Sequence, residues 1–293
     1  MIIVNLIGGL GNQMFQYAAG RALAAELSVP LRLDVSGFAD YALHQGFELQ
    51  RIFNCPAELA SEHDVRRVLG WQLPLVFRLA LSRLNMTMPK PRCWVAEPHF
   101  HYWSGIHKTL PESYLEGYWQ SEKYFVDMAA QIREDFTFQL PMSDENADLS
   151  KHIAQVNAVS LHVRRGDYAS NAKTTATHGL CSLDYYREAI NHITKHVDQP
   201  YFFIFSDDIT WVKENLELDF PCEFISNNQG QESYNDMRLM SLCQHHIIAN
   251  SSFSWWGAWL NSRPNKIVVA PKSWFANEIH NAQDLIPDEW VRL

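Results

Sequence analysis

The stretch Ser160-Leu161-His162-Val163-Arg164-Arg165-Gly166-Asp167-Tyr168 joins an apolar run to a pair of arginines followed by a glycine. With the two-residue period of a strand, the apolar positions face one side, and the polar ones, including His162 and Arg164, face the other. The polar side chains are thus expected where the strand ends. Ligands bind at the carboxyl ends of strands in parallel α/β sheets, and an arginine fork suits a phosphate or diphosphate. We therefore predict such a site here, with surface arginines before a turn as the alternative.

The chain after this stretch alternates helix and strand patterns. Ser182 is a candidate N-cap for a helix with an apolar stripe from Tyr186 to Val197, and Pro200 separates that helix from a short apolar run at 201–205, typical of a buried strand. The same criteria predict, in order, a helix over 209–216, a strand over 222–225, a helix over 232–243, a strand over 246–249, a helix over 254–260 and a strand over 266–270. Repeated strand–helix units indicate a parallel sheet with helices on both faces.

Four of these strands end in small polar or charged residues. The groups are His162 with Arg164, Ser206-Asp207-Asp208, Ser226-Asn227-Asn228 and Asn250-Ser251-Ser252. Asp, Asn and Ser also favour turns and helix caps, so local capping is the competing explanation for each group. Because the carboxyl ends of neighbouring parallel strands share one edge of a sheet, we favour a common binding site.

The chemistry of these groups suits a nucleotide. Ser251 or Ser252, at the start of the predicted helix, offers hydroxyl and backbone N–H groups to an anion. Asp207 or Asp208 can accept hydrogen bonds from N1–H and the exocyclic amine of guanine.

The first residues form a second strand–helix signal. A strand is predicted over 2–7, a glycine-rich turn over 8–12, a helix over 13–27 and a strand over 31–34. Gly8-x-x-Gly11 is not the dinucleotide-binding fingerprint, and Asp34 matches the expected ribose-binding acid only loosely. We therefore expect these glycines to let the backbone and Asn12 approach a substrate closely. The stretch from about 55 to 115 is irregular in composition and predicts no topology.

Composition narrows the class of partner and the compartment. With 293 residues, 47% of them hydrophobic, the chain is long enough for two soluble α/β domains. Its net charge of −9 argues against a nucleic-acid partner. Five widely spaced cysteines without a C-x-x-C pair predict neither a disulfide framework nor a zinc site, so a reducing cytoplasm is expected. The first strand has no basic region before it and does not resemble a signal peptide.

One segment departs from this acidic pattern. Between Asp64 and Glu97 there is no acidic residue, and six basic residues lie among apolar ones at 66–92. Peripheral contact with the inner face of a bacterial membrane is a hypothesis for this segment, and a helical insertion packed on its domain is the alternative.

Three blocks resemble a known family. Gly-Gly-Leu-Gly-Asn-Gln-Met-Phe-Gln-Tyr at 8–17, His-Val-Arg-Arg-Gly-Asp-Tyr at 162–168 and Ile-Ala-Asn-Ser-Ser-Phe-Ser-Trp-Trp-Gly-Ala at 248–258 are similar to the signature blocks of bacterial O-antigen α-1,2-fucosyltransferases. The segment Gly-Tyr-Trp-Gln-Ser at 117–121 fits as well. The resemblance spans nearly the whole chain.

The resemblance implies an inverting, metal-independent enzyme with a GT-B-like α/β fold, in which two Rossmann-type domains face a cleft. It implies transfer of fucose from GDP-fucose to the 2-hydroxyl of a terminal β-galactose, with Arg164 on the donor β-phosphate. We expect an acceptor-side domain at 1–150, with an irregular or helical insertion at about 55–115, and a GDP-fucose domain at 151–293.

The chemistry of the residues is compatible with this activity. A diphosphate leaving group needs its charge neutralised, and no Asp-x-Asp metal motif is present, so Arg164, helped by His162, is expected to act as the electrophile. The expected catalytic residues are Arg164, His162, Asp34 and Asn12. The expected donor-binding residues are Gly9, Gly11, Asn12, His162, Arg164, Ser206, Asp207, Asp208, Asn227, Asn250, Ser251, Ser252 and Phe253. We predict no metal-binding residue and no cofactor besides the donor substrate.

The general base is left open. Asp34 is the first candidate for accepting the proton of the incoming hydroxyl, with Asn12 positioning the acceptor or the phosphate. Asp34 can equally cap the turn at Ser36-Gly37, and His44, Glu48 and Asp167 are further candidates. For Asp167, a structural ion pair with Arg165 is the preferred role.

Other readings follow from single features. A nucleotide-dependent oxidoreductase and a non-catalytic nucleotide-sugar binder are the alternative functions. His245-His246 and His99-Phe100-His101 are expected to be core or surface histidines rather than metal ligands. At least two of Trp255, Trp256 and Trp259 are expected in the core. The loop at 171–177, followed by His178, is a candidate flexible segment over the site.

Overall fold

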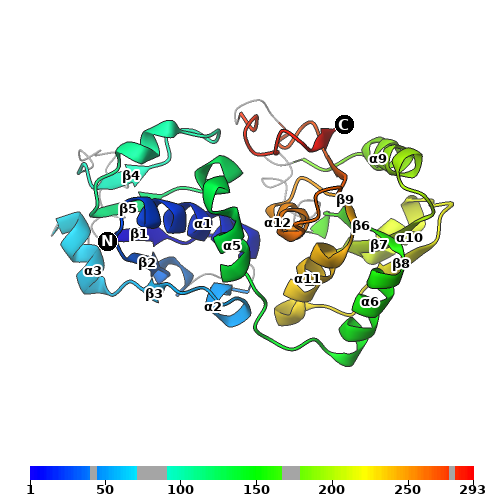
Figure 1. Ribbon diagram of the computed structural model, residues 1–293, viewed down its shortest axis with the longest axis horizontal. Helices are drawn as coiled ribbons and strands as arrows, with labels where there is room; N and C mark the ends of the chain where they lie inside the picture. The colour runs from blue at the N-terminus through cyan, green and yellow to red at the C-terminus, as the bar shows by residue number, and fades with distance from the viewer. Residues whose placement is uncertain (40–44, 71–90, 167–178, 277–280) are drawn as a thin grey trace. The chain divides into compact units, whose positions relative to one another are not determined.

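The computed structural model describes residues 1–39, 45–70, 91–166, 179–276 and 281–293. These residues form two α/β units, Met1–Thr137 and Phe138–Leu293, each built on its own sheet (Figure 1). The predicted α/β class with two Rossmann-type units is therefore confirmed. Along the chain, the boundary between the units lies at 137/138 rather than at 150/151, so the segment 138–150 belongs to the second unit.

The first unit contains a five-stranded sheet in the order β3-β2-β1-β5-β4. Its strands all pair in parallel. They are β1 (Ile2–Asn5), β2 (Leu31–Asp34), β3 (Glu58–Leu59), β4 (Trp94–Ala96) and β5 (Ser113–Glu116). Strands β1 and β2 correspond to the predicted strands, while β3, β4 and β5 come from the stretch that predicted no topology. The expected insertion at 55–115 thus contributes strands to the sheet itself.

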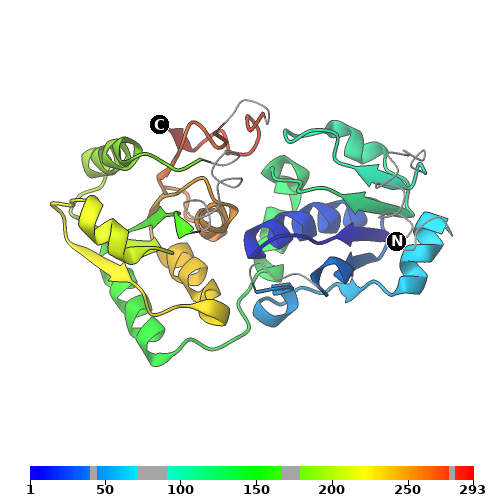
Figure 2. The ribbon, with the colours of Figure 1, turned by 180° about the vertical axis from the view of Figure 1, so that it is seen from behind.

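Helices cover both faces of this sheet, as Figures 1 and 2 show. Helix α1 (Leu10–Glu26) packs so closely on β1 that a Cβ at Gly20 would lie 2.2 Å from Val4 Cγ2. Helix α3 (Glu62–Leu69) packs through its buried end against Ile3 and Tyr114. The remaining helices among the described residues of this unit are α2 (Leu49–Ile52), α5 (Ala129–Asp135) and the short 3-10 turns η1 (Ser36–Phe38), η3 (Ser104–Lys108), η4 (Glu122–Tyr124) and η5 (Val126–Met128).

The second unit contains a six-stranded parallel sheet in the order β11-β10-β9-β6-β7-β8. Its strands are β6 (Asn157–Val163), β7 (Pro200–Ser206), β8 (Cys222–Ile225), β9 (His245–Ile247), β10 (Val268–Ala270) and β11 (Val291–Arg292). The helices in its described part are α6 (Asp144–Gln155), α9 (Leu183–His196), α10 (Ile209–Asn215), the 3-10 turn η6 (Gly230–Glu232), α11 (Tyr234–Leu242) and α12 (Ser252–Leu260).

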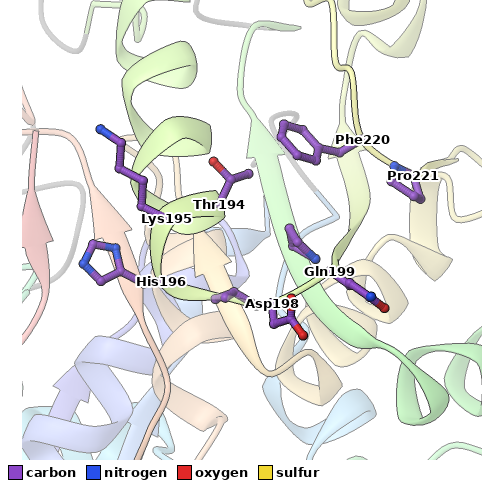
Figure 3. A pocket seen from close by; sticks show the side chains of 9 residues that line it. Thr194, Lys195, His196, Asp198, Gln199, Phe220 and Pro221 are labelled. Atoms are coloured by element: carbon purple, nitrogen blue, oxygen red, sulfur yellow. The ribbon is translucent and has the colours of Figure 1, made fainter.

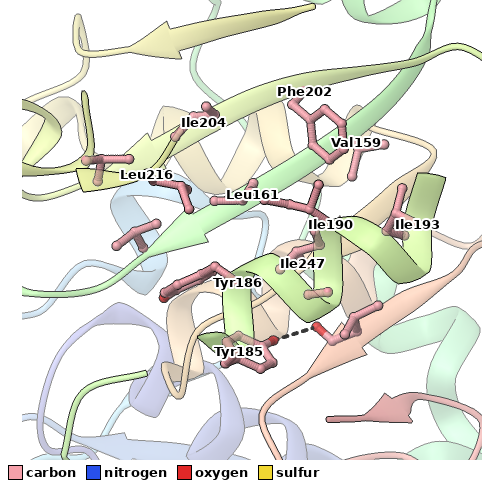
Figure 4. Close-up of a cluster of buried hydrophobic side chains, with 14 of the residues drawn as sticks. Val159, Leu161, Tyr185, Tyr186, Ile190, Ile193, Phe202, Ile204, Leu216 and Ile247 are labelled. Carbon is pink, nitrogen blue, oxygen red and sulfur yellow. Dashed lines mark hydrogen bonds between the residues drawn. The ribbon is translucent and has the colours of Figure 1, made fainter. Parts of the chain in front are cut away.

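Alternate residues of the central strands enter two different cores. Phe202 and Ile204 of β7 pack with α9 and α10, whereas Phe203 and Phe205 pack with α6 and α11. Figure 4 shows the first core, in which the buried Tyr185 hydroxyl donates to Val269 O at 3.1 Å. A sheet buried on both faces explains why its strands read as continuous apolar runs.

The predicted helix–strand alternation of this half is confirmed. Ser182 caps α9 by accepting a hydrogen bond from Tyr185 N at 3.1 Å. Trp255, Trp256 and Trp259 are all buried, and Trp255 Nε1 donates to Leu285 O. The prediction that at least two of these tryptophans lie in the core is therefore confirmed, and the third is buried as well.

The basic segment 66–92 is described in part, since 71–90, with Arg78, Arg83 and Lys90, lie outside the described residues. At its start, Arg66 pairs with Glu62 at 2.9 Å, and Arg67 pairs with Glu112. Among the residues the structure describes, no helix is both long and apolar enough to cross a membrane. Contact of this segment with a membrane surface stays a prediction.

Candidate active site

The polar groups predicted at strand ends lie at one edge of the second sheet. Strands β9, β6, β7 and β8 are consecutive neighbours, and all run parallel. Val163 at the end of β6 is in register with Ser206 at the end of β7. The residues that follow these four strands therefore share what we call the carboxyl edge of this sheet.

Arg164 and Asp207 form the central ion pair of this edge. Arg164 Nη1 lies 2.9 Å from Asp207 Oδ2, and the other carboxylate oxygen accepts a hydrogen bond from Arg165 N at 2.8 Å. Both side chains of the pair remain one-quarter exposed. Asp207 thus holds the guanidinium and the backbone of the arginine pair with its two oxygens, an arrangement that preorganises a cation beside solvent.

Gly166 makes this close approach possible. A Cβ at this position would lie 2.5 Å from Asp207 Oδ2. Any side chain here would displace the carboxylate or the turn that follows β6.

The second arginine is held differently. The Arg165 guanidinium lies 3.6 Å above the Trp211 ring, and its Nε is 3.8 Å from Asp208 Oδ2. These contacts come from α10 and the residue before it. The expected partner Asp167 lies outside the described residues, so an ion pair with it stays a prediction.

His162 is a buried, neutral imidazole. Burial lowers its pKa to about 4, the nearby Asp207 opposes this shift and Arg164 adds to it. Its Nδ1 is buried and has no hydrogen-bond partner among the described residues, and its ring lies 6.1 Å from that of Phe253. At neutral pH the positive charge beside His162 therefore comes from Arg164, and His162 offers a hydrogen bond rather than a charge.

Ser206 and Asp208 make local capping contacts. Ser206 Oγ accepts a hydrogen bond from Asp208 N at 3.0 Å, and Asp208 Oδ1 accepts one from Trp211 N at 3.1 Å, which caps α10. The capping alternative thus applies to both residues. Recognition of guanine by Asp207 or Asp208 stays a prediction, and for Asp207 both oxygens already have partners within the chain.

The group after β8 belongs to an amide–carboxyl network. Asn227 Nδ2 donates to Asn146 Oδ1 at 3.1 Å, and Asn228 Nδ2 donates to Asp236 Oδ1 at 2.8 Å. Burial raises the Asp236 pKa to about 7, while the hydrogen bond from Asn228 acts in the opposite direction. This network ties the carboxyl edge to α6 and α11, a connection that no sequence motif indicated.

The group after β9 leads into α12. Asn250 Nδ2 donates to Trp274 O at 3.2 Å, and its Oδ1 accepts a weak bond from Cys181 Sγ at 3.4 Å. Ser251 is the N-cap residue, but its hydroxyl makes no capping hydrogen bond in the described chain, and Ser252 and Phe253 form the first turn. The Phe253 ring lies 6.1 Å from that of His162, so the first turn of α12 lies near His162. Anion binding by this helix terminus stays a prediction.

In the first unit, the glycine-rich turn connects β1 to α1. Gly9 is the N-cap of α1, and Gly11 is buried in its first turn. Gly8 carries the unusual backbone, with a φ of 79°, and a Cβ there would lie 2.6 Å from Asn12 Nδ2. Gly8 was not among the predicted site residues, although its position at the start of the glycine-rich turn could have indicated that it needs an unusual backbone conformation.

Asn12 is bonded to a segment far away in sequence. Gln120 Nε2 donates to Asn12 Oδ1 at 2.8 Å. Gln120 lies in the Gly-Tyr-Trp-Gln-Ser segment at 117–121, for which the sequence predicted no function. The structure thus joins two of the resembling segments through one side-chain hydrogen bond.

Asp34 caps the turn after β2. Its Oδ1 accepts from Ser36 N at 2.9 Å, and its Oδ2 accepts from the Tyr114 hydroxyl at 2.7 Å. This is the capping role left open by the sequence. Of the other base candidates, Glu48 pairs with Arg51 at 3.0 Å, and His44 and Asp167 lie outside the described residues.

The remaining histidine pairs behave as core and surface residues. His246 is fully buried between Ser160 Oγ and Asn261 Nδ2, each at 2.8 Å, and burial lowers its pKa well below the usual value. His99 and His101 stack at 3.6 Å near the surface. The loop at 171–177 and His178 lie outside the described residues.

A hollow of about 660 Å³ lies elsewhere on the second unit (Figure 3). It is lined by the end of α9 and the start of β7, including His196 and Asp198, together with Phe220 and Pro221. These residues are at the amino ends of the strands, opposite the carboxyl edge, so the hollow includes none of the candidate site residues.

The chain is similar to known glycosyltransferases over most of its length. Alpha-1,2-colitosyltransferase of Escherichia coli is 37% identical over 298 residues, which cover 100% of this chain and 99% of that protein. Galactoside 2-alpha-L-fucosyltransferase SEC1 of Bos taurus is 26% identical over 267 residues, which cover 88% of this chain and 63% of that protein.

Among solved structures, fucosyltransferase NodZ from Bradyrhizobium has a TM-score of 0.50 at 14% identity, covering 87% of this chain and 91% of that chain. This likeness concerns the fold alone, and it agrees with the GT-B-like class expected for two Rossmann-type units. The model of glycosyl transferase family 11 matches residues 98–293, which include the whole carboxyl edge described above. Together with the full-length similarity to the Escherichia coli enzyme, this match shows that the chain belongs to glycosyl transferase family 11.

Proposed function

We propose that the protein is an inverting galactoside α-1,2-fucosyltransferase, which transfers L-fucose from GDP-fucose to the 2-hydroxyl of a terminal β-galactose. The observation that carries the proposal is the Arg164–Asp207 pair at the carboxyl edge of the second sheet. A partly exposed guanidinium, fixed from one side by a carboxylate, suits the β-phosphate of a nucleoside diphosphate.

The reaction requires charge neutralisation at the leaving group. As the bond between fucose C1 and the β-phosphate oxygen breaks, negative charge grows on GDP, and the sugar acquires oxocarbenium character. Arg164 strengthens its interaction with the phosphate as that charge develops, which lowers the barrier. In the proposed mechanism Arg164 takes the place of a divalent ion, and the neutral His162 and the start of α12 supply further hydrogen bonds.

The acceptor side requires a group to receive the hydroxyl proton. The acceptor oxygen attacks C1 from the face opposite GDP, which inverts the configuration, and its proton passes to a base or to water. Asp34 uses two of its roughly four acceptor positions for Ser36 N and the Tyr114 hydroxyl, so its carboxylate retains capacity for a third partner. We assign Asp34 as the candidate base and Asn12 as the group that positions the acceptor hydroxyl.

A second donor is favoured by a specific observation. A full-length Escherichia coli relative is an α-1,2-colitosyltransferase, and colitose is fucose without its 3-hydroxyl. GDP-colitose would present the same diphosphate to Arg164. The two donors then differ only in contacts to the sugar ring.

Two measurements test the proposal. In thermal-shift assays with EDTA present, GDP is expected to stabilise the protein, whereas UDP and NAD are not. In transfer assays with GDP-fucose or GDP-colitose and a panel of β-galactosides, product with an α-1,2 linkage is expected. Stabilisation by NAD instead of GDP would indicate the oxidoreductase alternative, and GDP binding without turnover on any acceptor would indicate a non-catalytic binder.

A further inference from the structure

We propose that Glu97 is a positioning residue for the transfer reaction, because it clamps the turn at 117–120 and thereby fixes the side-chain amide of Asn12 through Gln120. The inference rests on the proposed function, which places Asn12 beside the acceptor. Glu97 acts through Asn12, so its loss should slow the reaction without changing how the donor nucleotide binds to the second unit.

The clamp consists of two hydrogen bonds to consecutive backbone groups. Glu97 directly follows β4, and its Oε2 accepts from Tyr118 N at 2.7 Å while its Oε1 accepts from Trp119 N at 3.1 Å. An ionised carboxylate can accept both bonds, since it offers only acceptor positions. A neutral amide at this position would present an NH₂ group to one of the two backbone donors.

The turn itself is built to receive this carboxylate. A Cβ on Gly117 would lie 2.4 Å from Glu97 Cβ and 2.8 Å from Glu97 Oε2, so the approach requires a glycine. Trp119 is fully buried and has a φ of 56°, a left-handed conformation that is rare for a bulky residue. Such outliers persist only where the surrounding structure holds them, and they cluster at functional sites.

The clamped turn is hydrogen-bonded to Asn12. Gln120, which is 7% exposed, follows Trp119 and donates from Nε2 to Asn12 Oδ1 at 2.8 Å. This bond orients the Asn12 amide, so that its Nδ2 lies on the side of Gly8. A continuous series of hydrogen bonds and chain contacts thus runs from the Glu97 carboxylate, just after β4, through the turn and Gln120 to Asn12 in the first turn of α1.

The Glu97 carboxyl group is expected to gain or lose its proton near neutral pH. Burial raises the Glu97 pKa to about 7, against the two backbone hydrogen bonds and His99, which lower it. The neighbouring titratable groups are His99 on the same segment and Tyr118 on the turn, whose own pKa is raised by burial and by Glu97. Protonation of Glu97 removes one acceptor from the clamp, so we expect the turn to loosen below this pH.

The first test compares Glu97→Gln and Glu97→Ala with Glu116→Gln in transfer assays. Glu116 is the matched control, because it is a glutamate of the adjacent strand β5 that bonds to a side chain, Trp94 Nε1, at 2.8 Å. We expect kcat to fall about tenfold for Glu97→Gln and about 10²-fold for Glu97→Ala, on the scale of a misplacement of about 1 Å. Stabilisation by GDP should stay at the wild-type level in all three, and Glu116→Gln should keep its kcat.

The second test reads the clamp without activity. In ¹⁵N-labelled wild-type protein, the backbone amide signals of Tyr118 and Trp119 and the side-chain amide of Asn12 should shift with one common midpoint near pH 7. In Glu97→Gln this common titration should be absent. If Glu97→Ala does not fold, Gln120→Leu replaces it, with the same expected loss of kcat.

The outcomes separate this inference from the proposed function. An inactive wild type would overturn the proposed function, while the amide titration would still decide whether Glu97 controls Asn12. An active wild type with unchanged kcat in Glu97→Gln and Gln120→Leu would overturn the positioning role alone. Titration of Tyr118 and Trp119 without Asn12, or an equal loss of kcat in Glu116→Gln, would also contradict it.

Discussion

Asp207 Oδ2 lies 2.9 Å from Arg164 Nη1, and the two residues directly follow neighbouring strands although they are far apart in sequence. The carboxylate thus fixes the direction of the guanidinium before any ligand arrives. Because its second oxygen accepts from Arg165 N, the same residue also holds the chain that carries Arg164. Preorganised charge of this kind needs little rearrangement when a leaving group becomes negative.

Asp207→Asn tests this preorganisation. The amide retains an acceptor for Arg165 N but loses the ion pair, so Arg164 should keep its charge and lose its direction. We expect kcat to fall by about 10- to 10²-fold, the range associated with small misplacements of catalytic groups. The measurement is steady-state transfer with saturating donor, and Asp184→Asn, which removes an exposed ion pair with Arg187, serves as control. An unchanged kcat would show that Arg164 needs no carboxylate to hold it.

Gly166→Ala addresses the same pair from the backbone. The added Cβ would lie 2.5 Å from Asp207 Oδ2, so the carboxylate must move away from Arg164. We expect weaker stabilisation by GDP and a lower kcat, while Gly37→Ala, whose Cβ would meet nothing within 4 Å, should behave like the wild type. If Gly166→Ala binds GDP normally and turns over at the wild-type rate, the close packing at this turn has no role in the site.

Asp34→Asn decides between the two roles open to Asp34. The amide can still accept from Ser36 N, so the turn after β2 should persist with a modest loss of stability. If Asp34 receives the acceptor proton, kcat should fall by about 10²- to 10⁴-fold, the usual contribution of a general base. A lower unfolding temperature with kcat preserved would identify Asp34 as a cap only, and the proton would then pass to water.

The raised pKa of Asp236 leads us to expect that the stability of the protein depends on pH. Its pKa is raised from 3.8 in the unfolded chain to about 7 in the folded protein, mainly by burial. The folded state therefore binds this proton more tightly, and the free energy of unfolding should fall as the pH rises from about 4 to 7 and then level off. Asp236→Asn stays neutral at every pH and still accepts from Asn228. The difference in free energy of unfolding between this variant and the wild type should therefore favour the variant by at least ~1 kcal/mol more at pH 8 than at pH 4.

Urea denaturation of both proteins at the two pH values measures this difference. Glu97, whose pKa is also raised to about 7, contributes the same trend to both proteins and cancels in the comparison. Parallel pH profiles for the wild type and Asp236→Asn would contradict the raised pKa of Asp236.

The second unit was largely predictable because its signals are local. A buried parallel sheet produces apolar runs such as 201–205, and Ser182 and Pro200 mark helix and strand boundaries by their own chemistry. The position of Arg164 at a strand end followed from the two-residue period. The sequence did not predict which residue pairs with Arg164. The order of the strands placed Asp207 at the same edge of the sheet, but it did not pair Asp207 with a particular guanidinium.

The first unit was less predictable for a physical reason. Strands β3, β4 and β5 span two to four residues, too few for a period to appear. They are strands because a neighbouring strand offers each of them a hydrogen-bonding edge: β2 pairs with β3, β1 with β5, and β5 with β4. Glu97 belongs to no motif in this irregular stretch, and its proposed role arises only when the turn of Gly117 and Trp119 folds against it. The left-handed backbone of Trp119 is a tertiary effect that opposes the local preference of the residue.

The most direct test of the account is the transfer rate of Arg164→Ala from GDP-fucose to a β-galactoside, measured with EDTA present beside the wild type. We expect the wild type to keep its activity and the variant to lose at least ~10² in kcat, the scale for removing one donor that stabilises developing charge. Near-normal transfer by Arg164→Ala, or a wild type that stops when metals are chelated, would contradict the central role of this guanidinium.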